Sequence, residues 1–370
     1  MSQQTLHTQL CDLLNVKYPI IQAGMGGHTT PELVAAVSNA GGLGILGASR
    51  LTTQQLKDAI HKIKSLTSHP FGVNLVLAPP EPSNDEVATA QRFLDQFRKE
   101  LNIPLSSAIN ANHIQLPPSP IPDYLRIILE EEKVPVLSIG LGDPTKLVEQ
   151  AHTSNAKVMA MVTTVEEATK VVKGGVDIVV AQGSEAGGHR STFQLNMNDK
   201  EEVPMVGTLA LVPQIVDAVA IPVIAAGGIM DGRGLVASLA LGAAGVLLGT
   251  RFMVARESGT FQAYRERMFT AKETDTVITR SFTGRPARSI RNRFIEEYHK
   301  SGFTPLAWPL QALAADDIYS AAQANSKTEY YPLLAGQGLR LLKKDQGAAE
   351  IIEEIVQDAN KIISRLKDII

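Results

Sequence analysis

The chain contains little cysteine and little net charge. Its one cysteine, Cys11, excludes an intrachain disulfide and a metal cluster built on cysteine. We interpret Cys11 as a small apolar filler and not as a nucleophile, and we expect no metal site. A net charge of −3 at pH 7 gives no general reason to expect binding to nucleic acid or to acidic membranes.

The sequence also lacks a targeting segment and a long apolar run. Residues 1–14 show no basic region followed by an extended apolar stretch, so we predict no signal peptide. The uncharged stretch from Gly234 to Thr250 is slightly short for a membrane span. We therefore expect a cytoplasmic protein that acts without a membrane.

Strand and helix patterns alternate along most of the chain. Hydrophobic residues make up 44% and charged residues 20% of the 370 residues, which predicts a large core. Short runs rich in valine, isoleucine and leucine alternate with helical segments, and eight such repeats predict a closed (β/α)₈ barrel, an α/β fold. The expected strands are 19–25, 42–47, 71–77, 134–140, 156–162, about 176–182, 221–227 and 242–250; the expected helices are 31–40, 52–66, 122–132, 144–153, 165–173, 206–219 and 231–240.

The alternative to a barrel is an open, doubly wound sheet, which predicts a dinucleotide fingerprint at its first turn. A GxGxxG pattern does occur at Gly42, Gly44 and Gly47. It lies inside the second expected strand and does not open a helix, so we reject it as a nucleotide signature. Close packing of the backbone explains these glycines better.

A proline-rich segment, 78–122, interrupts the alternation and predicts an insertion with one helix around 86–101. We expect the barrel to comprise 1–77 and 123–255. Residues 78–122 and 256–334 should form a smaller cap over the barrel mouth, and 335–370 a C-terminal helical segment that packs on the barrel. The amphipathic tail mixes charges of both signs on its polar face, which favours packing on the barrel or on the other subunit of a homodimer over membrane binding.

One motif combines a buried strand with a polar loop. Residues 176–191, VDIVVAQGSEAGGHRS, begin as an apolar run and end in a glycine-rich loop that carries His189. Loops at the carboxyl ends of parallel strands carry the chemistry in α/β folds, and only His189 in this loop has an ordinary pKa near neutrality. Glu185 is a candidate to orient its ring, although a solvated carboxylate is the simpler interpretation.

A second pair of loops has the pattern of a phosphate site. Gly227 and Gly228 follow the seventh expected strand, and Gly249 and Thr250 follow the eighth. Barrels bind phosphate at these loops through exposed backbone N–H groups. Tight turns are the competing explanation for the glycines. A single phosphate site points to a mononucleotide cofactor, but physical reasoning alone does not identify it.

Several motifs together resemble the nitronate monooxygenase family, formerly called 2-nitropropane dioxygenases. The resemblance covers most of 15–300, and the same motifs recur in flavin-dependent enoyl-ACP reductases and in some NADH:quinone reductases. The motifs are PIIQAGMGG at 19–27, TPELVAAVSNAGGLG at 30–44, FGVNL at 71–75, AQGSEAGGHRS at 181–191, AAGGIMDGRG with GVLLGTRF, and AGQG at 335–338.

The resemblance implies FMN as the cofactor and His189 as the catalytic residue. Asn74 and Gln182 resemble residues that contact the flavin ring, and both side chains carry a donor and an acceptor. The sequence departs from the family pattern in QAGMGG, which is intermediate between the monooxygenase and reductase forms, and in Ser191, where glycine is common. The implied cofactor-binding residues are Ala23, Gly24, Met25, Asn74, Gln182, Gly187, Gly188, Gly227, Gly228, Leu247, Leu248, Gly249 and Thr250.

Three functions remain open on this basis. The first is the oxidation of an alkyl nitronate or nitroalkane with O₂ to a carbonyl compound and nitrite. The second is an NAD(P)H-dependent flavin reductase acting on an enoyl thioester or a quinone. A flavin-binding module without catalysis is the third, and it gives no reason for a histidine in the loop after strand six.

Two further groups have a structural interpretation that is simpler than a functional one. The arginines at 280–293 are interpreted as a solvated helix face that pairs with Glu296 and Glu297; the alternative is a receptor for the phosphates of a dinucleotide or for an acyl-carrier protein. The aromatic residues are interpreted as core rather than as the substrate pocket. The groups are Arg280, Arg285, Arg288, Arg291 and Arg293, and Tyr298, Trp308, Tyr330 and Tyr331.

Overall fold

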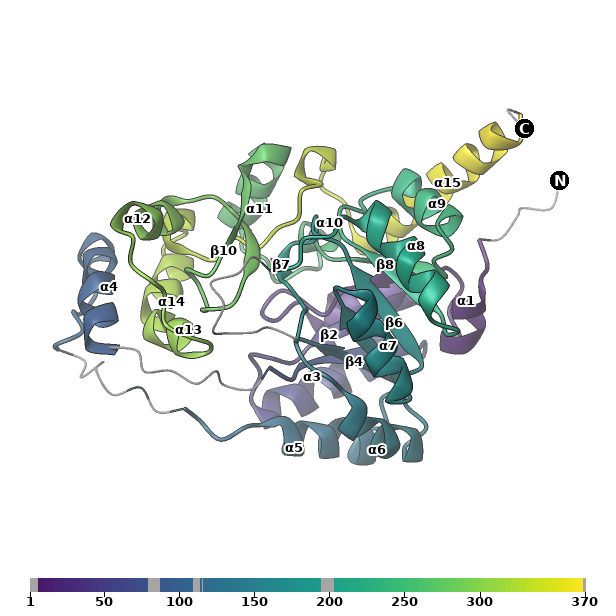
Figure 1. The fold of residues 1–370 in the computed structure, drawn as a ribbon, viewed down its shortest axis with the longest axis horizontal. Helices are drawn as coiled ribbons and strands as arrows, with labels where there is room; N and C mark the ends of the chain where they lie inside the picture. Colours follow the sequence, from purple (N-terminus) through teal and green to yellow (C-terminus); the bar gives the residue numbers. More distant parts are fainter. Residues whose placement is uncertain (1–5, 79–86, 109–113, 115, 194–202, 369–370) are drawn as a thin grey trace.

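A closed barrel of eight parallel strands forms the centre of the molecule, which confirms the predicted fold class (Figure 1). The computed structural model describes residues 6–78, 87–108, 114, 116–193 and 203–368. Neighbouring strands follow one another in chain order, and β1 closes the barrel by pairing with β9. The barrel strands are β1 (Ile20–Gln22), β2 (Leu43–Gly47), β3 (Phe71–Val76), β4 (Val136–Gly140), β5 (Lys157–Val162), β6 (Ile178–Gln182), β8 (Val223–Ala226) and β9 (Gly245–Leu248).

Helices of the barrel begin where the sequence supplies capping residues. Thr30 accepts a hydrogen bond from the backbone N–H of Leu33, and Pro31 occupies the first turn of the next helix. Thr52 and Gln55 form a reciprocal capping box. The helices that accompany the barrel are α1 (Gln9–Leu14), α2 (Pro31–Asn39), α3 (Thr53–Leu66), α5 (Ile121–Leu125, continued by a π-helical turn at Arg126–Glu131), α6 (Val148–Thr153, preceded by a 3₁₀ turn at Thr145–Leu147), α7 (Val165–Lys173), α8 (Thr208–Ala218), α9 (Gly232–Ala240), α10 (Thr250–Met253) and α15 (Ala348–Lys367).

A small antiparallel sheet, which the sequence analysis did not predict, adjoins the barrel. Its strands lie in the order β10 (Thr276–Thr279), β11 (Ala287–Ile290) and β7 (Gly188–His189). The loop after β6 is therefore not entirely irregular, because Gly188 and His189 pair with Arg288 and Ala287. The pairing fixes the backbone of this loop against a segment about a hundred residues later in the chain.

The remaining helices lie to one side of the barrel, with α4 beside α12 and α14 (Figure 1). Buried residues of α4 share one hydrophobic cluster with residues between Met253 and Leu342, separate from the clusters inside and around the barrel. The assignment of these segments to a distinct cap stays a prediction. The helices are α4 (Val87–Leu101), α11 (Gln262–Thr270), α12 (Arg293–Ser301), α13 (Leu310–Ala314) and α14 (Asp316–Ala324), with 3₁₀ turns at Glu273–Asp275, Thr328–Tyr330 and Leu339–Leu341.

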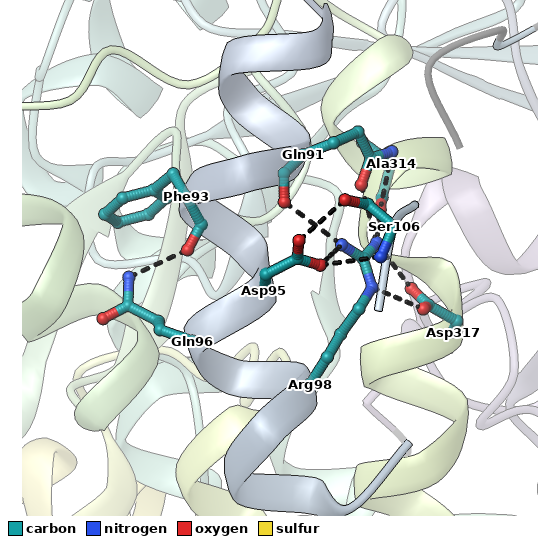
Figure 2. A network of polar contacts seen from close by, with 8 residues as sticks. All are labelled: Gln91, Phe93, Asp95, Gln96, Arg98, Ser106, Ala314 and Asp317. Atoms are coloured by element: carbon teal, nitrogen blue, oxygen red, sulfur yellow. Dashed lines mark hydrogen bonds and ion pairs between the residues drawn. The ribbon is translucent and has the colours of Figure 1, made fainter. Parts of the chain in front are cut away.

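A buried arginine joins α4 to this group of helices (Figure 2). The side chain of Arg98 is 1% exposed and bonds Asp317 through two nitrogen atoms, at 2.8 and 3.3 Å. It also donates to Asp95 on its own helix at 3.0 Å and to the backbone oxygen of Ala314 at 3.0 Å. Each of these groups compensates part of the cost of burying the charge.

Four smaller expectations can be compared with the structure. Glycine is required by packing within β2, because a Cβ on Gly44 would lie 2.2 Å from the backbone oxygen of Val34. Cys11 is a free, buried thiol. None of the helices in the described part of the chain is both long and apolar enough to cross a membrane. The tail helix α15 lies against α9 and α2.

Candidate active site

The carboxyl ends of the barrel strands surround one cavity of about 230 Å³. All the strands of a parallel barrel end at the same face, so residues distant in sequence meet there. Each site residue proposed from the sequence borders this cavity. They are Ala23, Gly24, Met25, Asn74, Gln182, Gly187, Gly188, His189, Gly227, Gly228, Leu247, Leu248, Gly249 and Thr250. Their contacts with a ligand stay a prediction.

His189 is held at both its backbone and its ring. The backbone pairs with Ala287 of β11, and its carbonyl oxygen accepts a hydrogen bond from the side-chain amide of Gln182 at 3.0 Å. On the ring, Nε2 lies 2.9 Å from the hydroxyl of Thr283, and the indole of Trp308 packs edge-on at 5.7 Å between centroids. Within the described part of the chain, Nδ1 has no hydrogen-bond partner.

The environment of His189 favours its neutral form. Burial, together with the positive charges of Arg285 and Arg50, lowers the pKa of its imidazole from 6.5 to about 4. No acidic side chain occurs among the described residues that line the cavity. At neutral pH the ring therefore offers one N–H donor and one basic nitrogen, not a positive charge.

Gln182 and Asn74 both have partners within the protein. The amide of Gln182 donates to the His189 carbonyl, and its oxygen accepts from the backbone N–H of Ser191 at 2.9 Å. Gln182 thus fixes the loop that carries His189. Asn74 Nδ2 donates to the backbone oxygen of Ser138 at 3.2 Å and to its hydroxyl at 3.1 Å. The side-chain oxygen Oδ1 of Asn74 accepts no hydrogen bond from the described residues, and Asn74 borders the same cavity.

Ser191, which stands where glycine is common in the family, has a structural reason to be serine. Its hydroxyl accepts a hydrogen bond from the backbone N–H of Leu141 at 2.9 Å. The bond joins the loop after β6 to the end of β4. The departure from the family pattern therefore stabilises the position of the loop.

The glycines of the expected phosphate site differ in their backbone requirements. Gly227 and Gly228 have φ of +114° and +72°, so the turn explanation applies to both. Gly249 has φ of −100°, which any residue adopts. A Cβ on Gly249 would approach nothing nearer than Met25 Sδ at 3.6 Å, so neither the backbone nor the packing requires glycine there.

These loops fit an anionic phosphate. Among the described residues, the backbone N–H groups of Gly227, Gly228, Gly249 and Thr250 donate no hydrogen bond. Unsatisfied amides at adjacent loops form a favourable site for a phosphate. The open space over Gly249 is a second feature that a bound group would occupy. The described residues contain no group of three or more histidine, cysteine, aspartate or glutamate side chains placed to hold a metal ion.

The interpretation of the arginines as a solvated helix face is wrong for most of them. Arg288 lies on β11 and is buried, where it donates twice to the backbone oxygen of Ser184, at 3.0 and 2.8 Å. Arg285 is also buried and donates to the backbone oxygen of Thr192 at 2.8 Å.

The other arginines are nearer to the surface. Arg291 pairs with Glu296 as expected, at 3.0 Å, whereas Arg293 pairs with Glu100 on α4 and Arg280 donates to the backbone of Gly284. The local pattern did not reveal that this segment forms strands.

Glu185 is neither an orienting partner of His189 nor a freely solvated carboxylate. Its two oxygens accept hydrogen bonds from the backbone N–H and the hydroxyl of Thr208 at the start of α8, at 2.9–3.0 Å. The backbone oxygen of Glu185 accepts from Gln337 at 3.0 Å. Glu185 therefore connects the loop after β6 to α8 and to the AGQG segment.

Sequence reasoning missed several residues around His189. His28 borders the same cavity, and its Nδ1 lies 3.1 Å from the hydroxyl of Thr260. Burial, followed by the charge of Arg50, lowers the pKa of His28 to about 4. The guanidinium of Arg190 donates to the backbone oxygens of Gly183 and Gln182, at 2.6 and 3.0 Å, and so braces the start of the loop.

Of these residues, only Arg190 could be linked to His189 from the sequence, because it is the next residue in the chain. The role of Thr283 depends on a contact across 94 positions of the chain, and no local pattern marks it. Of the aromatic group, Tyr298 and Tyr331 are buried in the cluster beside α4, as the core interpretation requires. Trp308 is the member that approaches His189.

Comparison with known proteins gives a consistent family assignment. A family model described as nitronate monooxygenase matches residues 7–358. A probable nitronate monooxygenase of Staphylococcus haemolyticus is 40% identical over 360 residues, which cover 97% of this chain and 98% of that protein. Among solved structures, a nitroalkane oxidase from Streptomyces ansochromogenes matches with a TM-score of 0.86 at 33% identity, covering 96% of this chain and 99% of the other. FabK from Thermotoga maritima matches with a TM-score of 0.79 at 32% identity, covering 99% and 100%. The chain belongs to the nitronate monooxygenase family.

Proposed function

We propose that the protein binds FMN and oxidises alkyl nitronates with O₂ to a carbonyl compound and nitrite. The observation that carries this proposal is the position of His189, which borders a cavity without acidic side chains and is fixed by Gln182 and Thr283. Family membership supports a flavin, and the unpaired amides of Gly227, Gly228, Gly249 and Thr250 support one phosphate site, as a mononucleotide requires. O₂ is the second substrate.

The cofactor is proposed to lie with its phosphate on the amides of Gly227, Gly228, Gly249 and Thr250. The side-chain oxygen Oδ1 of Asn74 and the remaining hydrogen-bonding capacity of Gln182 are available to the ring. The other proposed contacts are made by Ala23, Gly24, Met25, Gly187, Gly188, Leu247 and Leu248, which border the same cavity. Bound FMN would accept electrons from the substrate carbon and pass them to O₂.

His189 is proposed to hold the substrate and to exchange its proton. The hydroxyl of Thr283 lies within hydrogen-bond distance of Nε2, and it can act as donor or acceptor. When Nε2 carries the ring proton, Nδ1 can accept a proton from the carbon of a nitroalkane. When the hydroxyl donates to Nε2, Nδ1 carries the proton and can donate to a nitronate oxygen.

An NAD(P)H-dependent reductase is the second candidate, because FabK from Thermotoga maritima has a similar structure. The arginines that were candidates for its dinucleotide phosphates are engaged within the protein, with Arg285 and Arg288 bonded to backbone oxygens. This observation favours the oxidase.

The first prediction concerns His189→Asn, which keeps a polar side chain but cannot carry a proton in the same pH range. We expect the variant to retain FMN and to form nitrite from ethyl nitronate about 10²-fold more slowly, the usual scale for losing an acid–base group. Nitrite and acetaldehyde are measured together in air. The control is His299→Asn, an exposed histidine on α12, which should leave the rate unchanged. Near-normal nitrite formation by the FMN-loaded His189→Asn variant would show that His189 is not catalytic.

A further inference from the structure

An exposed arginine stands beside the mouth of the cavity and has no partner among the described residues. Arg50 follows Ser49, which borders the cavity from the loop after β2. No hydrogen bond or ion pair joins the guanidinium of Arg50 to the described part of the chain, whereas most other arginines are paired.

The backbone of the first barrel loop keeps this arginine close to the cavity. A Cβ on Gly26 would lie 2.3 Å from the hydroxyl of Ser49, and a Cβ on Gly27 would lie 3.8 Å from Cδ of Arg50. The segment 49–50 therefore packs directly over the Gly26–Gly27 turn. Gly26 and His28 of the same loop and Ser49 border the cavity, so the stem of Arg50 lies directly beside residues of the cavity wall.

The charge of Arg50 acts on groups from several elements around the cavity. It lowers the pKa of His28. It also lowers the pKa of His189, where the charge of Arg285 has the larger effect. Either ring is therefore harder to protonate. Arg50 also lowers the pKa of Tyr331, which burial raises. No carboxylate acts on His28 or His189 to offset these positive charges. The space between the two histidines is thus positively polarised although neither histidine is charged at neutral pH.

We propose that Arg50, with Ser49 beside it, forms an anion subsite at the cavity mouth that selects the nitronate anion over the neutral nitroalkane. The identity of the anion rests on the proposed function. A nitronate shares one negative charge between two coplanar oxygens, as a carboxylate does, and a guanidinium binds that geometry well. His189 is neutral, and the guanidinium of Arg285 is bonded to the backbone oxygen of Thr192, so the discrimination between anion and neutral molecule falls to Arg50, which has no partner among the described residues.

The subsite can be tested without turnover. Propionate has the same number of heavy atoms as ethyl nitronate and does not react with a flavin, and propionamide is its neutral counterpart. Trp308 is the only tryptophan of the chain, and its ring lies 5.7 Å from that of His189, so its emission reports binding in the FMN-loaded protein. We expect tighter binding of propionate than of propionamide, with only the propionate affinity weakened by added salt.

Three variants assign the effect to Arg50. Arg50→Gln should lower the propionate affinity by about tenfold and leave that of propionamide unchanged. Arg50→Lys should keep most of the preference, because it keeps the charge. The matched control is Arg126→Gln, an exposed arginine on the outer face of the barrel that pairs with Glu131, and it should behave as the native protein. In turnover, Arg50→Gln should lower kcat/KM for ethyl nitronate by a similar factor and spare nitroethane.

Unchanged propionate binding by Arg50→Gln, or a native protein that does not distinguish propionate from propionamide, would overturn the subsite. A native protein that shows the Arg50-dependent preference but forms no nitrite from ethyl nitronate would support the subsite and contradict the proposed function. The two hypotheses can therefore fail separately.

Discussion

At the scale of the residue, the cavity is bordered by two neutral histidines. The positive charge near them comes from Arg50 and Arg285, which do not border the cavity themselves. Burial and nearby arginines lower the pKa of both His28 and His189 to about 4. The sequence indicated His189 through its place after a buried strand. It did not indicate His28, because the histidine follows the glycine turn of the first loop and no local pattern distinguishes it from a surface residue.

The second prediction concerns the pH dependence of the reaction. A pKa lowered to about 4 means that His189 is neutral at pH 6 and above and becomes protonated only as the pH falls through that value. We expect kcat/KM for ethyl nitronate to show no inflection from His189 between about pH 6 and pH 8. The measurement is the initial rate of nitrite formation with preformed nitronate. An inflection near pH 6.5 that disappears in the His189→Asn variant would contradict the assigned environment.

At the scale of the element, regular repeats could be predicted and long-range pairings could not. Valine- and leucine-rich runs marked the eight barrel strands, because this signal is local. Strand β7 has only two residues, one of them Gly188, and its partner β11 lies about a hundred positions later. Two residues carry no periodicity, so neither the small sheet nor the burial of Arg288 could be deduced from the sequence.

The insertion helix α4 provides the third prediction. Arg98 is buried among Asp95, Asp317 and the backbone of Ala314 (Figure 2). Arg98→Met would leave two partly exposed carboxylates without their cation and the backbone oxygen of Ala314 without its donor, and losing hydrogen bonds to a charged group costs about 1.5–3 kcal/mol. We expect a loss of unfolding free energy in that range by urea denaturation. Arg92→Met on the exposed face of the same helix should change it by less than about 0.5 kcal/mol. Equal losses of unfolding free energy in the two variants would show that the Arg98 network does not stabilise the fold more than an exposed arginine does.

The network also sets a direction for acid denaturation. Burial raises the pKa of Asp95, but hydrogen bonds from Ser106 and Arg98 outweigh it and hold the pKa below 3.8. A lowered carboxylate pKa contributes stability above the unfolded value and loses it as the pH falls through the folded value. Its contribution therefore weakens only in acid, below about pH 4.

At the scale of the whole molecule, the barrel brings loops from every strand to one face. The sequence was sufficient to predict that these loops meet, because closure of eight strands determines it. The position of α4 and α12–α14 beside the barrel could not be predicted. It depends on packing between residues that are far apart in the sequence, and composition gives no information about such contacts. Trp308 reaches His189 through that packing.

The fourth prediction concerns the cofactor that this face holds. Denaturation of the purified, yellow protein should release FMN and not FAD, as determined by chromatography of the supernatant. Gly249→Val adds a side chain where the backbone and neighbours permit one, so we expect the fold to persist while FMN affinity falls at least about tenfold. Thermal unfolding of the FMN-free proteins serves as the control. Stoichiometric FAD, or full FMN binding by Gly249→Val, would contradict the proposed phosphate site.

The most direct test of the central claim is the reduction of the flavin in the absence of O₂. The FMN-loaded protein is mixed anaerobically with ethyl nitronate, and separately with NADH or NADPH, while the visible absorbance of the flavin is followed. The account predicts rapid bleaching by the nitronate and slow or absent bleaching by either dinucleotide, because the arginines between Arg280 and Arg293 are engaged within the protein. Rapid bleaching by NADH or NADPH with none by the nitronate would contradict it and identify the protein as a reductase.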